Sequence, residues 1–163
     1  MRSQDRFRGC LIGGAAGDAL GYAVEFMRER DICRMFGEKG ITEYELSKGK
    51  ALFSDDTQMT LFTATGLLLG TTRGMTRGVG GPSPFYIGLC YQDWLQTQEK
   101  SYSPEMRGRY SWLANIPELY SPRAPGNTCL AALRSGKPGT TEEPINNSKG
   151  CGGVMRVTPI GLY

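Results

Sequence analysis

The stretch SDDTQMTLFTATGLLL, residues 54–69, decides the fold class. From Thr57 to Leu69 its residues follow the pattern of a buried helix. Helical patterns also cover most of residues 4–35, residues 85–98 and residues 127–134. Signals for strands are thin, and neither a strand–helix alternation nor an internal repeat is present. The sequence therefore predicts an all-α fold.

Polar, glycine-rich or proline-rich segments separate these helices. We expect loops at 36–53, with a short extended piece at 41–46, and at 74–84, 100–127 and 136–150. Prolines interrupt the third of these loops, which should hold at most a short turn. Residues 151–163 begin a final helix or turn.

The composition limits the chemistry. The 163 residues, 39% of them hydrophobic, suffice for one soluble domain with a real core. The chain has no histidine. This excludes a Ser-His-Asp triad, a Cys-His pair and any histidine-based metal site. Acid–base or metal chemistry must therefore use carboxylates, hydroxyls, thiols or lysine.

Charge and cysteine usage indicate a cytoplasmic protein. The 19 basic and 16 acidic residues are mixed along the chain, so no patch for nucleic acid or membrane is predicted. The five cysteines form no C-x-x-C pair, which favours reduced thiols. Residues 1–24 superficially resemble a secretory leader, but Asp18 and several glycines interrupt the apolar stretch. The run at 59–70 is too short to span a membrane.

The tetrapeptide Ser54–Thr57 allows two interpretations. Adjacent carboxylates flanked by hydroxyls are hard oxygen donors, which suit Mg²⁺ or Mn²⁺. Alternatively, the segment caps a helix, with Asp55 and Gln58 at capping-box spacing and acidic residues at the positive end of the helix dipole. The two roles are compatible, because a capped helix start is a rigid place for ligands.

A second candidate lies in the first helical segment. Four glycines spaced four residues apart form one ridge: Gly9, Gly13, Gly17 and Gly21. Each costs about 1 kcal/mol relative to alanine, so the ridge predicts close approach of another helix or a ligand. Asp18 lies beside the ridge, and Glu25 follows on the same helical face. Glu25 is a candidate carboxylate near a metal-bound water. The alternative is that Asp18 pairs with an arginine and Glu25 faces solvent.

A third candidate is NNSKGCGGVMR, residues 146–156. Glycines that lead into a helix leave backbone N–H groups for an anion such as a phosphate, and the asparagine, serine and lysine side chains add donors. A plain glycine-rich turn is the alternative. Dinucleotide-binding and P-loop motifs are absent.

Taken in order, these motifs resemble the ADP-ribosylglycohydrolase family of the dinitrogenase reductase-activating type. The resemblance rests on four segments: RFRGCLIGGAAGDALGYAVEF (6–26), SDDTQMT (54–60), APGNTCLAAL (124–133) and NNSKGCGGVMRVTPIGL (146–162). It implies an all-α fold with two Mg²⁺ ions in a central cleft. It also implies hydrolysis of the glycosidic bond that joins ADP-ribose to a protein side chain or a related acceptor. The expected partner is then an ADP-ribosylated protein or a small molecule that contains ADP-ribose.

The resemblance assigns roles to particular residues. Ser54, Asp55 and Asp56 match the first metal-ligand triplet, and Glu25 matches a mobile glutamate that contacts or gates the metal site. The loop that holds the ADP-ribose phosphates and distal ribose matches residues 147–153, namely Asn147, Ser148, Lys149, Gly150, Cys151, Gly152 and Gly153. Cys151 departs from the asparagine that many members carry there.

One feature of the family pattern is missing. The second metal motif, Asp-x-Asp-Thr, has no counterpart, because no Asp-x-Asp occurs in the chain. We therefore expect residues 1–163 to be the N-terminal portion of a single ADP-ribosylglycohydrolase-like domain, with at most a partial Mg²⁺ site and little activity alone. An exposed half-core would favour self-association. The alternatives are a non-catalytic module that binds ADP-ribose and an ordinary helical scaffold in which residues 54–57 are only a cap.

Overall fold

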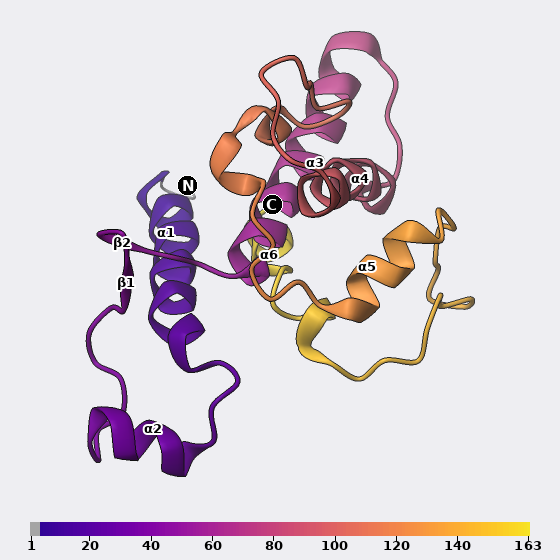
Figure 1. Cartoon of the computed structure of the whole chain (residues 1–163). Helices are drawn as coiled ribbons and strands as arrows, with labels where there is room; N and C mark the ends of the chain where they lie inside the picture. Colours follow the sequence, from indigo (N-terminus) through magenta and orange to yellow (C-terminus); the bar gives the residue numbers. More distant parts are fainter. Residues whose placement is uncertain (1–3) are drawn as a thin grey trace.

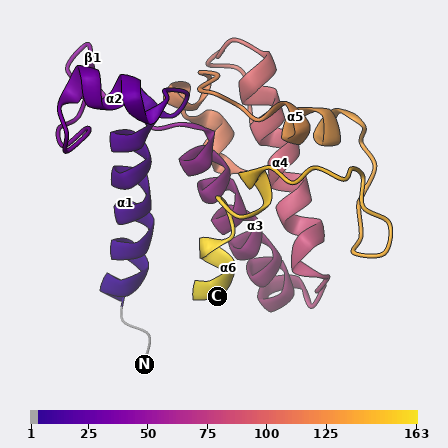
Figure 2. The same cartoon turned by 90° about the horizontal axis from the view of Figure 1, so that it is seen from below.

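A computed structural model describes residues 4–163 and confirms the all-α fold. Residues 1–3, where the leader-like stretch begins, lie outside the described residues. The helices in order are α1 (Gln4–Gly21), α2 (Glu29–Phe36), α3 (Asp55–Arg77), α4 (Ser83–Glu99), α5 (Asn127–Arg134) and α6 (Thr158–Leu162). In Figures 1 and 2, α1 and α2 lie on one side of the molecule, α4 and α5 on the other, and α3 and α6 between them.

The core lies between α3 and α4. Met59 and Phe62 of α3 and Trp94 of α4 are fully buried. The two helices come so close at Gly66 that a Cβ atom there would lie 2.5 Å from the Cα of Ile87. Glycine is therefore required at this crossing. The indole N–H of Trp94 donates to the side chain of the fully buried Gln58 at 3.0 Å, whereas Trp112 is exposed.

Helix α3 is longer than the sequence pattern predicts. It begins at Asp55 and continues through residues 74–77, which we expected in a loop. It ends at Gly78, whose φ of 64° forms the left-handed C-cap that glycine favours. A proline in the first turn favours the start of α4, because the backbone nitrogen at this position makes no hydrogen bond within a helix.

The N-terminal segment breaks earlier than predicted. Helix α1 ends at Gly21, a short 3₁₀ helix η1 (Tyr22–Val24) follows, and α2 begins only at Glu29. The continuous helix pattern predicted that Glu25 shares a helical face with Asp18, and this is wrong because α1 ends before Glu25. The glycine ridge does not approach another helix closely, since a Cβ at Gly9, Gly13, Gly17 or Gly21 would meet no atom within 4 Å. Close approach of a ligand to the ridge stays a prediction.

The remaining segments are short or irregular. Two-residue strands β1 (Leu46–Ser47) and β2 (Lys50–Ala51) form an antiparallel hairpin where we expected a loop with an extended piece. The proline-rich segment, where we expected at most a short turn, contains two 3₁₀ helices, η2 (Trp112–Asn115) and η3 (Pro117–Leu119). The predicted helix at 127–134 and the polar loop at 136–150 are confirmed, and η4 (Cys151–Gly153) precedes α6.

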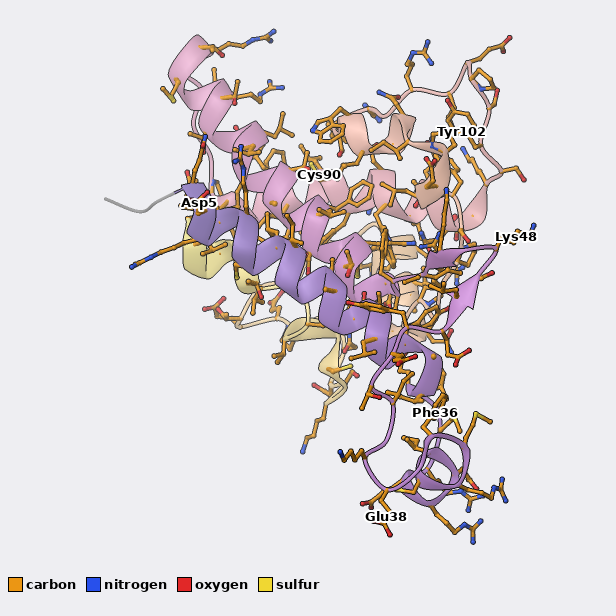
Figure 3. All side chains as sticks on the ribbon, turned by 90° about the vertical axis from the view of Figure 1, so that its left-hand side faces the viewer. Asp5, Phe36, Glu38, Lys48, Cys90 and Tyr102 are labelled. Atoms are coloured by element: carbon orange, nitrogen blue, oxygen red, sulfur yellow. The ribbon has the colours of Figure 1, made fainter. Side chains whose placement is uncertain are left out.

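Helix α1 packs loosely against the rest of the molecule. Ala19 is its one buried residue among those described, and Ile12 is 68% exposed. A groove of about 290 Å³ separates α1 from α3, with apolar walls that include Leu11 and Leu61. Figure 3 looks onto α1, with Asp5 near its N-terminal end and Phe36 of α2 beyond its other end. Self-association stays a prediction.

Within residues 4–163, no helix has the length and apolar character that a membrane span requires.

Candidate active site

The N-terminus of α3 is capped by Ser54. Its side-chain oxygen accepts the backbone N–H of Asp56 at 3.1 Å, and the residue is only 2% exposed. This confirms the predicted helix cap but moves it to Ser54. A box between Asp55 and Gln58 does not form, because the Gln58 side chain turns inward and donates to the Ser121 carbonyl at 3.1 Å. Helix capping therefore uses Ser54 and leaves the two aspartates for other roles.

Asp18 fixes α1 to this helix start. Its carboxylate accepts the backbone N–H of Ser54 at 2.9 Å, the backbone N–H of Thr57 at 3.1 Å and the Thr57 hydroxyl at 2.5 Å. The alternative of an arginine partner for Asp18 is wrong, since the ion pairs of the described chain do not involve Asp18. The other half of that alternative is confirmed, because Glu25 is exposed. A carboxylate is favourable here because the helix N-terminus carries unpaired N–H groups and partial positive charge.

Asp55 is buried at this point, with 3% of its surface exposed. One carboxylate oxygen accepts the backbone N–H of Gly126 at 3.1 Å, and the Asp55 backbone N–H donates to the Arg123 carbonyl at 2.9 Å. The pKa of Asp55 is raised to about 6. Burial is the largest cause and the negative charges of Asp56 and Asp18 add to it, while hydrogen bonds from the backbone N–H groups of Gly126 and of Asp55 itself oppose it. Ionisation of Asp55 at neutral pH therefore lowers the stability of the folded chain.

Asp56 and Glu25 share this electrostatic environment. Burial raises the pKa of Asp56, and the charge of Asp18 adds to the effect. Partial burial raises the pKa of Glu25, as do the charges of Asp56, Asp55 and Asp18, in that order. Within residues 4–163, neither the Asp56 nor the Glu25 carboxylate accepts a hydrogen bond. The structure thus brings Glu25 into electrostatic range of the aspartate pair, although Glu25 lies after the end of α1.

The predicted phosphate loop is exposed and organised by its own polar groups. Asn146 accepts the backbone N–H of Ser148 at 2.9 Å, and the Ser148 hydroxyl accepts the backbone N–H of Gly150 at 3.3 Å. Asn147, Lys149 and Cys151 are exposed, as is Gly153, while Gly152 is partly buried. The side chains needed for an anion are therefore accessible.

Three contacts attach the end of this loop to the helices. The Thr60 hydroxyl donates to the Met155 carbonyl at 3.2 Å. The Arg156 guanidinium lies 4.8 Å from the ring centre of Tyr91 and donates to the sulfur of Met59 at 3.3 Å. These contacts hold the loop beside α3, the helix that begins at the aspartate pair.

Comparison with known proteins identifies the family. The family model described as ADP-ribosylglycohydrolase matches residues 1–163. The chain belongs to the ADP-ribosylglycohydrolase family. Searches among curated proteins and among solved structures found no match. The all-α fold agrees with the expectation from the motifs, and membership of the family implies a glycohydrolase-type hydrolase.

The donors at the start of α3 fit a hard divalent cation in their chemistry. These donors are oxygen atoms. Among the described residues the carboxylates of Asp56 and Glu25 accept no hydrogen bond, and they repel each other. The set is partial: across residues 4–163, no three Asp, Glu or Cys side chains converge as metal ligands. The residues present can therefore supply one side of a cation site.

Sequence reasoning missed two structural roles in this chain. The first is the attachment of α1 by Asp18, whose partners lie 36 and 39 residues further along the chain. The second is the anchoring of the predicted phosphate loop by Arg156, which lies within a quoted motif but whose stacking partner Tyr91 is on α4. Neither pairing leaves a local signal, because both join segments distant in sequence.

Proposed function

We propose that this chain binds Mg²⁺ and an ADP-ribosylated substrate and takes part in hydrolysis of the glycosidic bond. The proposal is supported by one observation above all. Two unpaired carboxylates, Asp56 and Glu25, lie in electrostatic range of the buried Asp55 at the start of α3. Holding like charges together in this way costs stability, and a bound cation relieves that cost. The carboxylate arrangement therefore fits a ligand-binding role better than a purely structural one.

The residues at the start of α3 and in the turn after α1 have different proposed roles. Ser54, Asp55 and Asp56 would hold the metal, which when bound supplies positive charge close to the ribose oxygens. Asp18 and the Gly126 N–H fix the helix start and one oxygen of Asp55. Glu25 is exposed and has a raised pKa, so it is suited to accept a proton from water.

The exposed loop provides the groups for the rest of the substrate. Lys149 offers a positive charge, and Asn147 and Ser148 offer hydrogen-bond donors for phosphate oxygens. Glycines 150, 152 and 153 allow the backbone to approach the ligand. Cys151 occupies a position where a polar amide would add a donor, so we expect one contact fewer there.

A second candidate function has its own support. The described residues bring together no complete ligand set, and the sequence contains no Asp-x-Asp motif. A non-catalytic module that binds ADP-ribose would need only the loop and the partial cation site. The acceptor from which ADP-ribose is removed is left open by both candidates.

Calorimetry and a turnover assay test the proposal together. The chain is titrated with ADP-ribose with and without MgCl₂, and it is assayed on ADP-ribosyl-arginine and ADP-ribosyl-serine peptides. We expect Mg²⁺-dependent binding of ADP-ribose with little turnover by this chain alone. Asp56→Asn should weaken Mg²⁺ binding by about tenfold or more. Glu38→Gln, an exposed carboxylate on the loop after α2, is the matched control and should change nothing.

The outcomes separate the candidates. Turnover that Asp55→Asn abolishes would establish a hydrolase and show that the partial site suffices. Slow turnover that requires Mg²⁺ is the result that the proposal expects, whereas ADP-ribose binding with no detectable turnover at any Mg²⁺ concentration would favour the module. An absence of any response to Mg²⁺ or ADP-ribose would contradict both and leave a helical scaffold.

A further inference from the structure

Two cysteines lie in adjacent segments where the predicted phosphate loop contacts α5. Cys129 is a partly buried residue of α5, and Cys151 is exposed at the start of η4. The Gly152 backbone lies so close that a Cβ atom there would be 2.8 Å from the Cys129 sulfur. Cys151 is the residue directly before Gly152. Burial raises the pKa of Cys129, and the charge of Cys151 makes a smaller contribution in the same direction. A small movement of the backbone at Cys151 would therefore bring the two sulfur atoms together.

We propose that Cys129 and Cys151 form a site of reversible oxidation, in which a hydroperoxide converts them to an intramolecular disulfide. The segment between them, residues 135–150, consists of loop residues and is almost entirely exposed. This loop can adjust until the Cα atoms reach the separation that a disulfide requires, about 4.4–6.8 Å. Cys129 cannot move as far, because it belongs to a helix.

The other cysteines are poorer partners. Cys90 is fully buried on α4. Cys10 and Cys33 belong to α1 and α2, which lie on the opposite side of the molecule from α5 (Figures 1 and 2). Geometry and access therefore select one pair among the five cysteines of the chain.

The reaction balances with one hydroperoxide. The accessible Cys151 sulfur attacks one peroxide oxygen, the O–O bond breaks, and Cys151 becomes a sulfenic acid while an alcohol leaves. The Cys129 sulfur then attacks the Cys151 sulfur, the S–O bond breaks, and water leaves with the proton of the Cys129 thiol. Two thiols are oxidised by two electrons and the peroxide is reduced; with hydrogen peroxide, both leaving molecules are water.

The disulfide would couple redox state to the candidate site. Cys129 lies beside Gly126, where a Cβ atom would be 3.7 Å from its sulfur, and the Gly126 N–H binds Asp55. The Cys129 sulfur also accepts from Arg156, which anchors the loop, at 3.8 Å. Oxidation would therefore tie the predicted phosphate loop to α5. The expected change in ADP-ribose binding rests on the proposed function, whereas the disulfide itself does not.

Peptide mapping of the whole chain tests the disulfide directly. The protein is treated with hydrogen peroxide, free thiols are alkylated in denaturant, and trypsin digestion is analysed without reductant. The expected main product joins the peptides Ala124–Arg134 and Gly150–Arg156 and disappears with dithiothreitol. It should be lost in Cys129→Ser and Cys151→Ser and kept in the control Cys33→Ser. Closing this loop should raise the Tm of the oxidised chain by about 5–10 °C.

Each result decides the proposal. A link mainly to another cysteine, a link between two chains on a non-reducing gel, or over-oxidised but unlinked thiols would overturn it. Titration with ADP-ribose before and after oxidation then tests the coupling. If the reduced chain does not bind ADP-ribose but the 129–151 link forms, the proposed function fails and the oxidation site stands.

Discussion

Asp55 has the most perturbed carboxyl group at the candidate site. It is buried, one of its oxygens accepts the backbone N–H of Gly126, and its pKa is raised to about 6 from an ordinary 3.8. At a pH between these two pKa values, the folded chain binds more protons than the unfolded chain. The free energy of unfolding therefore falls as the pH rises from about 4 to 6. A shift of this size corresponds to about 3 kcal/mol of lost stability at neutral pH.

Asp55→Asn should therefore stabilise the chain. The asparagine oxygen can keep the Gly126 hydrogen bond without the buried charge, so unfolding in urea at pH 7 should require about 1–3 kcal/mol more, measured in the presence of a chelator. The difference from the parent chain should vanish below about pH 4, where Asp55 is protonated in both states. Glu38→Gln serves as the exposed control. Equal stability of Asp55→Asn and the parent at pH 7 would show that the pKa of Asp55 is not raised in the folded chain.

The candidate residues could be predicted to different extents. Ser54, Asp55 and Asp56 are adjacent, so their hydroxyl and carboxylate chemistry is visible in the sequence. The anchor Asp18 was not predictable, because its hydrogen bonds join two helices across 36 residues. The position of Glu25 was predicted for an incorrect reason: it nears the aspartates through the turn after α1, not through a continuous helix.

At the scale of helices, two glycines have opposite environments. Gly66 lies where α3 crosses α4, and an added Cβ would overlap Ile87. Gly13 on α1 has no atom within 4 Å of such a Cβ. Gly66→Ala should therefore destabilise the chain by about 1–3 kcal/mol through overpacking. Gly13→Ala should stabilise it by up to about 1 kcal/mol through helix propensity.

Urea unfolding of the two alanine variants tests this contrast, with each glycine acting as the other's control. A destabilising Gly13→Ala would show that the α1 ridge does contact another helix in solution. A neutral Gly66→Ala would contradict the close crossing of α3 and α4.

Helix identity was predictable where the apolar pattern was strong. Thr57–Leu69 predicts α3 because its buried side chains recur at helical spacing. The extension to Arg77 was missed, since Gly74 and the polar residues around it suggest a loop while α3 continues until Gly78 adopts a positive φ. The threonines of α3 are tolerated because hydroxyls such as those of Thr63 and Thr71 donate to carbonyls four residues earlier.

Over the whole molecule, α1 is the least firmly held long helix. It buries one residue, Ala19, whereas α3 and α4 supply most of the core. Its polar attachment is the Asp18 carboxylate at the start of α3. Hydrogen exchange followed by mass spectrometry should therefore show faster exchange in residues 4–21 than in 55–77.

Asp18→Asn should increase this difference, because an amide offers one acceptor oxygen where the carboxylate offers two. Its effect should concentrate in α1 and at the start of α3. Asp5→Asn, an exposed substitution at the other end of α1, is the control and should leave exchange unchanged. Protection of α1 equal to that of α4 in the parent chain would contradict this account.

The two tryptophans provide an optical reporter of the candidate site. Trp94 is fully buried and its indole N–H binds Gln58, one helical turn from the Ser54 cap, whereas Trp112 is 64% exposed. A water-soluble quencher such as acrylamide should therefore extinguish the emission of Trp112 and spare that of Trp94. The remaining fluorescence would come from an indole linked to the start of α3. Changes at the aspartate pair could then be followed in the unlabelled chain.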